Sequence, residues 1–400
     1  MKNIFQKERR KSTIYYPENI SKNKYSGPVF GKYIPNTKNF NIISTEKKKG
    51  LDKIGFILAT NPFKNINIEK NSEYDFSELK KKLKQETANF FTEDIVKGYF
   101  FGYWDNDELC FIDIPDFKQC IKEKYTLKLD IFSRNTGILE SDIMLKKGVL
   151  LVGCGSVGSL FALELARAGV GHFFLVDNDI MAYHNICRHQ CGIYDVGKYK
   201  TDAVKERILE INPHAQVVTH NCIIQDVSID ALNKFCNKNT IVIGGADNRE
   251  GDLYANHIAH KIGMPLMSVG CWERAFAGEI FYCLPEGMPN YIDFMAALGE
   301  NSGRVNQNRK FYTNEENLEK ASFEPGISTD INFVTTIGVK LAIDILNIGN
   351  PNFTPRLINF LTQYTLVCNT NNIKIGGDMA EIFSYPLQVT TSIEIPYAEI

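Results

Sequence analysis

The sequence lacks three features that would each indicate a particular class of protein. It has no run of 18 apolar residues, so no segment is typical of a membrane-spanning helix and we expect no membrane partner. Its formal net charge is only −2, which makes nucleic acid an unexpected partner. None of its ten cysteines forms a CxxC pair, so we expect no structural zinc held by four cysteines.

Two further absences concern the cellular compartment. The first sixteen residues have no apolar core like that of a secretory signal. The cysteines are scattered, without the close and regular spacing of a disulfide framework. Together these features predict a reducing, cytoplasmic location. The chain has 400 residues, of which 44% are hydrophobic, and this length suggests two domains.

Residues 148–179 are the most informative part of the chain. They predict a buried strand, a glycine-rich turn, a helix and a second strand, which together form a nucleotide-binding βαβ unit. Gly153, Gly155 and Gly158 fit the GxGxxG spacing, which permits a tight turn, close approach to phosphate and close packing of helix on strand. Asp177 ends the second strand, where its carboxylate is placed to accept hydrogen bonds from ribose hydroxyls.

This glycine motif by itself is typical of nicotinamide or flavin dinucleotide sites, but the residues after it favour a triphosphate. Arg188 and Lys200 lie on polar segments beyond the second strand, and two positive side chains suit a triphosphate better than a pyrophosphate diester. Asp247 follows an apolar run, residues 240–246, that predicts a buried parallel strand. Ligands gather at the carboxyl ends of such strands, so Asp247 is placed to hold Mg²⁺. The sequence therefore predicts a site for ATP and Mg²⁺.

These residues, in this order, resemble the motifs of the ThiF family. That family comprises the adenylating domains of ubiquitin-activating enzymes and of bacterial enzymes that activate sulfur-carrier proteins. The resemblance covers about residues 134–346 and implies a Rossmann-like, mostly parallel α/β fold. The motifs that carry it are Gly153-x-Gly155-x-x-Gly158, Asp177-x-Asp179, Asn185-x-x-Arg188, Gly197-x-x-Lys200 and Asp247-Asn248.

The resemblance also implies a role for each matched residue. Asp177 would bind ribose, and Asp179 would shape the same pocket. The β- and γ-phosphates would be held by Asn185, Arg188 and Lys200. Asp247 would ligate Mg²⁺.

The same resemblance implies an activity and an assembly. The reaction would be ATP-dependent adenylation of the C-terminal carboxylate of a ubiquitin-like or sulfur-carrier protein, with release of pyrophosphate. Arg134 resembles the arginine that this family sends into the site of a partner subunit, which would make the active form a homodimer. A solvated linker arginine is the alternative interpretation of Arg134.

The chain departs from the family where a transfer cysteine would lie. The crossover loop expected within residues 286–330 contains no cysteine, and Ser322 falls near the usual cysteine position. A serine hydroxyl is a poor nucleophile without a base, so the sequence favours adenylation without a thioester. Cys271, at the end of an apolar run, is the alternative nucleophile.

The rest of the chain predicts its domain organisation. Residues 1–130 are expected to form a small α+β domain for substrate recognition or dimer support, with a strand at residues 54–59, a helix at 76–91 and a hairpin at 98–114. Residues 131–400 would form the adenylation domain, which ends in a strand-rich tail. Because residues 290–323 are polar with little periodicity, we expect most of the crossover region to be loop.

Several alternatives remain open from the sequence. The substrate could be a short peptide, as in microcin-maturing relatives, or a carboxylate on a tRNA base. The chain could also be a non-catalytic regulatory subunit, although retention of Arg188, Lys200 and Asp247 argues against that. His184, Cys187 and Cys191 lie close together in sequence, but their irregular spacing makes a metal site a weak hypothesis.

Overall fold

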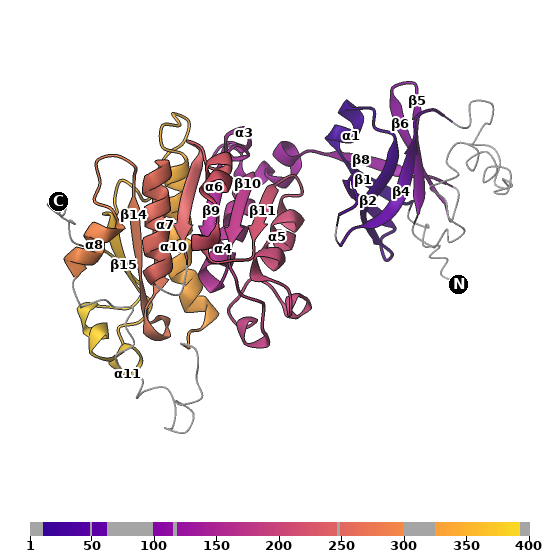
Figure 1. Cartoon of the computed structure of the whole chain (residues 1–400). Coiled ribbons are helices and arrows are strands. Elements are labelled where there is room, and N and C mark those ends of the chain that lie inside the picture. Colours follow the sequence, from indigo (N-terminus) through magenta and orange to yellow (C-terminus); the bar gives the residue numbers. More distant parts are fainter. Residues whose placement is uncertain are drawn as a thin grey trace, which may run out of the picture. The chain divides into compact units, whose positions relative to one another are not determined.

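The computed structural model divides the chain into two compact units, Met1–Ser133 and Arg134–Ile400 (Figure 1). Each unit has its own sheet and its own buried core. The residues that the structure describes are 11–48, 50–61, 99–114, 118–245, 249–298 and 325–392.

The first unit, in its described part, is built on one mixed sheet of eight strands in the order β7-β6-β5-β4-β2-β3-β1-β8. Aromatic rings fill one core of this unit, where the centroid of Phe100 lies 5.1 Å from that of Phe40 and 5.5 Å from that of Phe111. Its strands are β1 (Thr13–Pro17), β2 (Gly27–Ile34), β3 (Asn39–Ser44), β4 (Asp52–Leu58), β5 (Phe100–Asp105), β6 (Glu108–Asp113), β7 (Lys118–Gln119) and β8 (Ile121–Tyr125). Helix α1 spans Glu18–Lys22, and a π-helix spans Leu127–Ile131.

Two sequence predictions for this unit are confirmed. The strand expected at residues 54–59 is β4, and the expected hairpin is the antiparallel pair β5 and β6. Asp105 pairs with Glu108, so the turn is only two residues long, and Asn106 adopts a φ of 56° there. Asparagine tolerates this left-handed conformation better than most residues, which suits it to such a turn. The helix expected at residues 76–91 lies outside the described residues.

The second unit contains an eight-stranded sheet within its described residues, in the order β11-β10-β9-β12-β13-β14-β15-β16. The first five of these strands are parallel and the last three are antiparallel. The predicted Rossmann-like, mostly parallel α/β fold is therefore confirmed, and β15 and β16 form an antiparallel edge of its sheet. The strands are β9 (Gly148–Val152), β10 (His172–Val176), β11 (Gln216–His220), β12 (Thr240–Gly244), β13 (Leu266–Cys271), β14 (Ala277–Cys283), β15 (Tyr364–Cys368) and β16 (Gln388–Ser392).

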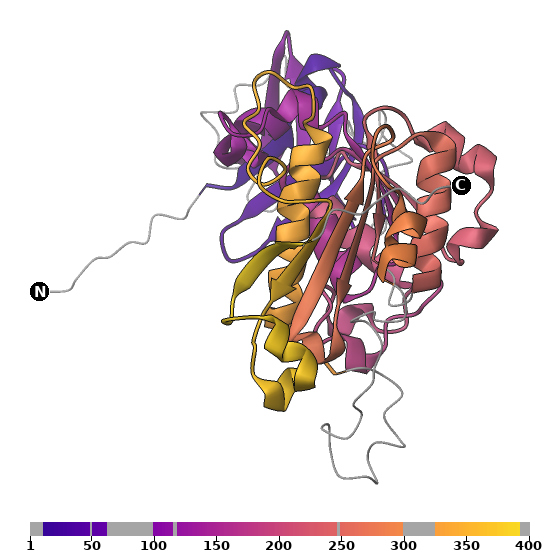
Figure 2. The same ribbon diagram turned by 90° about the vertical axis from the view of Figure 1, so that its left-hand side faces the viewer.

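Helices cover both faces of this sheet. Helices α4, α5 and α10 contribute to the core on one face, while α6, α7 and α8 contribute to the core on the other. Figure 2 shows α10 and α7 on opposite sides of the strands. The helices are α3 (Ser141–Met144), α4 (Ser156–Arg167), α5 (Lys200–Ile211), α6 (Ile229–Phe235), α7 (Arg249–Ile262), α8 (Tyr291–Leu298), α10 (Ser328–Leu346) and α11 (Ile373–Gly376). None of the described helices combines the length and hydrophobicity needed to cross a bilayer.

Strand β9, in the middle of the parallel part of the sheet, is the apolar run that the sequence predicted as a buried strand. Val149, Leu150 and Leu151 have no exposed surface, because helices cover both faces of the strand. A strand buried on both faces has no polar alternation, so it appears in sequence as a continuous apolar run. This arrangement fixes the position of the glycine-rich turn directly after the strand.

The prediction that most of the crossover region is loop is wrong in part. Helix α8 occupies residues that were expected to be loop, and α10 begins at Ser328, before the expected end of the crossover region. Tyr291 and Phe294 are 1% exposed and pack on Phe281, with ring-centroid distances of 5.2 and 5.1 Å. These two aromatic rings stabilise the helix, although a long polar segment follows it in the sequence. Residues 299–324, which include Ser322, lie outside the described part of the chain.

Candidate nucleotide-binding site

Three neighbouring parallel strands end together at one edge of the second sheet. Val152 of β9 pairs with Val176 of β10 and with Gly244 of β12. The residues that follow these strands therefore leave the sheet at the same level. This edge is where ligands bind in open α/β sheets, and it carries the predicted glycine-rich turn.

The three glycines of this turn, residues 153–158, have different structural roles. Gly153 adopts a φ of 93°, which favours glycine. A Cβ on Gly158 would lie only 1.9 Å from the Gly153 carbonyl oxygen, so α4 packs directly on the turn. A Cβ on Gly155 would meet nothing within 4 Å, which leaves an open side to the turn. Among the residues that the structure describes, no side chain is seen to cap the start of α4, so within this part of the chain its first N–H groups are available to an anion.

Asp177 binds the glycine turn to the end of β10. Its Oδ2 accepts the Cys154 N–H at 2.6 Å, and its Oδ1 accepts the Asp179 N–H at 2.7 Å. Burial raises the pKa of the Asp177 carboxyl, although these two hydrogen bonds oppose the shift. The residue expected to bind ribose thus also holds two loops together. Each oxygen keeps a further lone pair for a ligand hydroxyl.

Lys200 and Asp179 form an ion pair beside the turn. The Lys200 Nζ lies 2.6 Å from the Asp179 Oδ2, and the backbone N–H of Lys200 donates to the Asp179 carbonyl at 2.9 Å. The lysine side chain is 11% exposed, whereas the aspartate side chain is 61% exposed. The charge of Lys200 also lowers the pKa of Asp177 and of the Cys154 thiol, against the larger effect of burial. Lys200 therefore lies close to the glycine turn.

Asn185 and Arg188 lie on a short 3-10 helix, Tyr183–Asn185, and the turn that follows it. The Asn185 Oδ1 accepts the Ala182 N–H at 2.9 Å, so this side chain starts the turn, and its Nδ2 group is the part left for a ligand. The Arg188 N–H donates to the Asn185 carbonyl at 3.1 Å, and the arginine is half-buried. Their expected contacts with phosphate stay a prediction.

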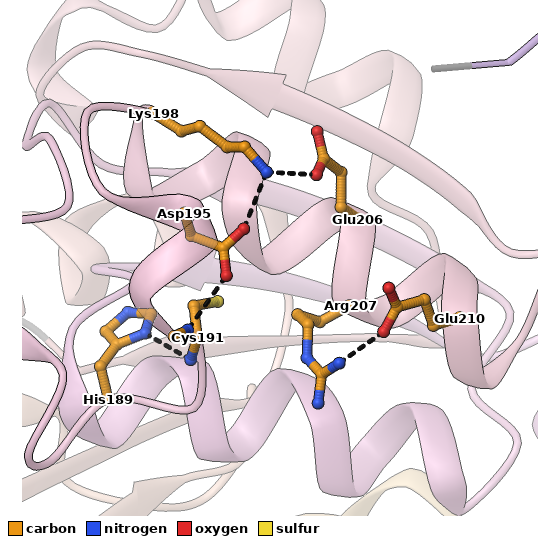
Figure 3. A network of polar contacts seen from close by, with 8 residues as sticks. His189, Cys191, Asp195, Lys198, Glu206, Arg207 and Glu210 are labelled. Atoms are coloured by element: carbon orange, nitrogen blue, oxygen red, sulfur yellow. Dashed lines mark hydrogen bonds and ion pairs between the residues drawn. The ribbon is translucent and has the colours of Figure 1, made fainter. Parts of the chain in front are cut away.

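An ion-pair network holds the segment between these residues and α5 (Figure 3). The Lys198 Nζ lies 2.8 Å from the Asp195 Oδ1 and 2.6 Å from the Glu206 Oε2. Hydrogen bonds to these two carboxylates raise the pKa of Lys198 above its usual value. Burial raises the pKa of the nearby Cys191 thiol to about 12, so it stays protonated at neutral pH. This segment is thus tied to α5 by charge as well as by the backbone.

Sequence reasoning missed one residue at this site, His189. It is 7% exposed, and its Nε2 lies 2.7 Å from the Cys154 carbonyl oxygen in the glycine turn. The only signal in the sequence was a histidine directly after Arg188. The sequence pattern instead singles out the neighbouring His184, Cys187 and Cys191 as a weak hypothesis for a metal site. Within the described ranges, no three such residues are grouped to hold a metal ion.

Other predicted residues lie elsewhere or outside the described part. Arg134 is exposed on a 3-10 helix, Ser133–Asn135, and the next residue, Asn135, donates from Nδ2 to the Arg167 carbonyl at 2.8 Å. Arg167 is the last residue of α4, at the end opposite the glycine turn. Cys271 ends β13, half-buried, and pairs with Gly278 of β14. Asp247 lies outside the described residues, so its expected metal contact stays a prediction.

The fold and this edge define a class of protein: a nucleotide-binding α/β domain with a glycine turn and a buried lysine beside it. A profile of the ThiF family matches residues 132–374, which is more than half of the chain. The chain belongs to the ThiF family.

Individual relatives match shorter segments. Ubiquitin-like modifier-activating enzyme 5 of Dictyostelium discoideum is 31% identical over 148 residues, which cover 34% of this chain and 38% of the relative. The probable molybdopterin-synthase adenylyltransferase of Porphyra purpurea is 32% identical over 161 residues, covering 39% and 40%. The aligned part thus spans less than half the length of these relatives. Among solved structures, E. coli MccB with ATP has a TM-score of 0.47 at 17% identity, covering 68% of this chain and 73% of MccB.

Proposed function

We propose that the protein adenylates the C-terminal carboxylate of a ubiquitin-like or sulfur-carrier protein, using ATP and releasing pyrophosphate. The observation that carries this proposal is the open glycine turn with Lys200 beside it, at the ends of three parallel strands in a ThiF-family chain. The names of the curated relatives, an activating enzyme and an adenylyltransferase, support the same class of reaction.

The described residues fit a nucleotide with a charged phosphate chain. The open side of Gly155 leaves room for phosphate oxygens against the backbone, and the uncapped start of α4 offers N–H donors to them. Asp177 would receive a ribose hydroxyl on a lone pair that the two loops leave free. Triphosphate oxygens would compete with Asp179 for Lys200, because the amine already forms an ion pair with this carboxylate.

The chemistry itself asks little of the protein. A carboxylate oxygen of the cargo would attack the α-phosphorus of ATP, and the bond to the bridging oxygen of pyrophosphate would break. A carboxylate is already ionised and nucleophilic at neutral pH, so no general base is needed. The contribution of Lys200, Arg188 and the helix start would be to position the triphosphate and to stabilise the charge on the leaving pyrophosphate.

Mg²⁺ is the metal that commonly accompanies ATP, and it supplies further neutralisation of phosphate charge when bound. We propose Asp247 as its ligand on the sequence pattern alone, since this residue comes three positions after the last residue of β12 in the sequence. The cargo's own carboxylate, not a metal-bound group, remains the nucleophile.

We further propose that the active form is a homodimer in which Arg134 serves the site of the other subunit. Within one chain, Asn135 donates a hydrogen bond to the last residue of α4, whereas the glycine turn lies at the first residue of this helix. A helix of 12 residues is roughly 18 Å long, which exceeds the reach of one arginine side chain. Arg134 therefore would not reach its own glycine turn, and a role in catalysis would need a second copy of the chain.

The edge of the second sheet offers a surface to which a protein cargo could bind. Strand β16 is the last strand in the described order, and β15 is its one described partner. Large apolar side chains beside it are exposed, with Tyr385 at 60% and Leu387 at 67%. An edge strand flanked by exposed apolar side chains is suited to pairing with a strand of another protein.

The test is ATP–pyrophosphate exchange by the purified protein, alone and with a panel of carriers ending in Gly-Gly, short peptides and total tRNA. We expect exchange that depends on a carrier and on Mg²⁺. A carrier shortened by its last two residues is the matched control and should give none. Exchange driven by a peptide or by tRNA would replace the proposed cargo with that class.

Absence of exchange with every substrate, in a protein shown to bind ATP, would favour a regulatory subunit and contradict the proposed activity. If exchange occurs, mass spectrometry of the protein after reaction tests for a covalent step. We expect no cargo attached to Cys271 or Ser322, because the chain lacks a cysteine at the transfer position.

A further inference from the structure

The peptide group between Cys154 and Gly155 lies at the centre of the glycine turn. On one side of this group, the Cys154 carbonyl faces the His189 ring at 2.7 Å. The preceding peptide group is held as well, since the Cys154 N–H donates to Asp177 at 2.6 Å. Cys154 is therefore fixed through both of its backbone polar atoms, and its side chain is fully buried.

The contacts of His189 define its protonation state. Its Nδ1 lies 3.0 Å from the backbone nitrogen of Cys191, which can only donate. Nδ1 is therefore the acceptor, and the proton of the neutral ring must be on Nε2. That proton points at the Cys154 carbonyl, so both ring nitrogens have suitable partners. The ring connects the glycine turn to the segment that carries Asn185 and Arg188.

The carbonyl and the N–H of one trans peptide point in opposite directions. Because the Cys154 carbonyl points toward His189, the Gly155 N–H must point away from it. Gly155 has open space around its Cα, and within the described residues no hydrogen bond uses its N–H. If this peptide turned over, a carbonyl oxygen would take the place of that donor and would repel a phosphate.

We propose that His189 is a positioning residue for nucleotide binding: by holding the Cys154 carbonyl, it keeps the Gly155 N–H available to the phosphate chain. This inference rests on the proposed use of ATP. A second contact supports it, since the next residue, Gln190, donates its N–H to the Ser159 Oγ of α4 at 3.3 Å. The segment after Arg188 thus contacts both the turn and the helix that follows it.

This role depends on a neutral histidine. A protonated ring would have two donors, and Nδ1 would then face the Cys191 N–H. Burial lowers the pKa of His189, so the ring is neutral at pH 7 and gains its proton only as the pH falls below the usual value of about 6.5. Charged and titratable groups around the ring come from each neighbouring element: Cys154, Asp177, Cys191, Asp195 and Lys200.

The test compares His189→Ala and His189→Gln with the unchanged protein by calorimetric titration with ATP and with adenosine. Loss of one hydrogen bond at the turn should weaken ATP binding by about fivefold or more in His189→Ala. Adenosine binding should not change, because adenosine has no phosphate. A glutamine offers both a donor and an acceptor, so His189→Gln should restore much of the ATP affinity.

Between pH 7.5 and 5.5, ATP affinity should fall further in the unchanged protein than in His189→Gln, which does not titrate there. Asp177 and the nucleotide phosphates are common to both proteins and cancel in this comparison.

Three results would overturn the inference: unchanged ATP affinity in His189→Ala, equal loss of ATP and adenosine binding, or identical pH profiles for the unchanged protein and His189→Gln. Failure of the unchanged protein to bind ATP would instead overturn the proposed function, and this inference with it.

Discussion

The glycine turn offers a matched pair of substitutions that separates folding from ligand binding. In Gly158→Ala the new methyl group would lie 1.9 Å from the Gly153 carbonyl oxygen, far inside van der Waals contact. In Gly155→Ala the methyl group would meet no protein atom within 4 Å, and the residue has a φ of −74°, which alanine adopts readily. One change therefore acts on packing, and the other acts on the space outside the turn.

The expected magnitudes follow from these distances. In Gly158→Ala, α4 would have to move by about 1.5–2 Å to restore an ordinary contact. Overpacking of this kind costs about 1–3 kcal/mol, which the better helix propensity of alanine offsets by at most about 1 kcal/mol. The melting temperature should fall, by about 2–4 °C for each net kcal/mol. Gly155→Ala should change stability by less than about 1 kcal/mol.

For the affinity for ATP, Gly155→Ala is the variant expected to have a direct effect. The Gly155→Ala methyl group would enter the space proposed for phosphate, and a misfit of about 1–3 kcal/mol corresponds to roughly 5- to 150-fold weaker ATP binding. Calorimetric melting and ATP titration of both variants measure the two effects. An ATP affinity unchanged in Gly155→Ala would refute the placement of phosphate at this turn. Unchanged melting of Gly158→Ala would refute the close packing of α4.

Three further predictions concern charge. Lys200→Met should weaken ATP binding by about 10- to 100-fold, since a charge-assisted hydrogen bond to phosphate is lost. The control variant Lys205→Met, on the same helix, should leave ATP binding unchanged. Titration of both variants with ATP checks this prediction. Arg134→Ala mixed with Asp247→Ala should recover pyrophosphate exchange in mixed dimers, and no recovery despite subunit exchange would argue against an arginine supplied by the partner. The free energy of unfolding should fall as the pH drops below about 6.5, because the unfolded chain protonates His189 first. Chemical denaturation should find this part of the fall missing in His189→Gln.

The secondary structure that sequence patterns predicted best is the part buried on both sides. The apolar runs of β9 and β12 each reflect contact with a core on both faces of the sheet. Helix α8 was missed because it is only eight residues long and a long polar segment follows it in the sequence. Its buried face is formed by Tyr291 and Phe294, with Met295 packed against the same core.

In the site, too, some features could be predicted from the sequence and others could not. Gly153 and Gly158 were predictable because a backbone constraint leaves glycine as the residue that fits. The contact between His189 and the Cys154 carbonyl was not, because it joins a side chain to a backbone atom 35 residues away and needs no particular residue type at the acceptor. The ion pair between Lys200 and Asp179 was not predictable either, because the sequence motifs imply a role in ligand binding for each residue and not a contact between them.

That ion pair has a consequence for turnover. Without nucleotide, Lys200 already has a counter-ion in Asp179, so the arrival of ATP would exchange one anion for another rather than neutralise a bare charge. Because Asp179 is largely exposed, its carboxylate can be released into water at little cost. When pyrophosphate leaves, the same carboxylate is available to take back the lysine. Such a resident competitor would limit the affinity for both ATP and pyrophosphate, and it would therefore favour rapid release of the product.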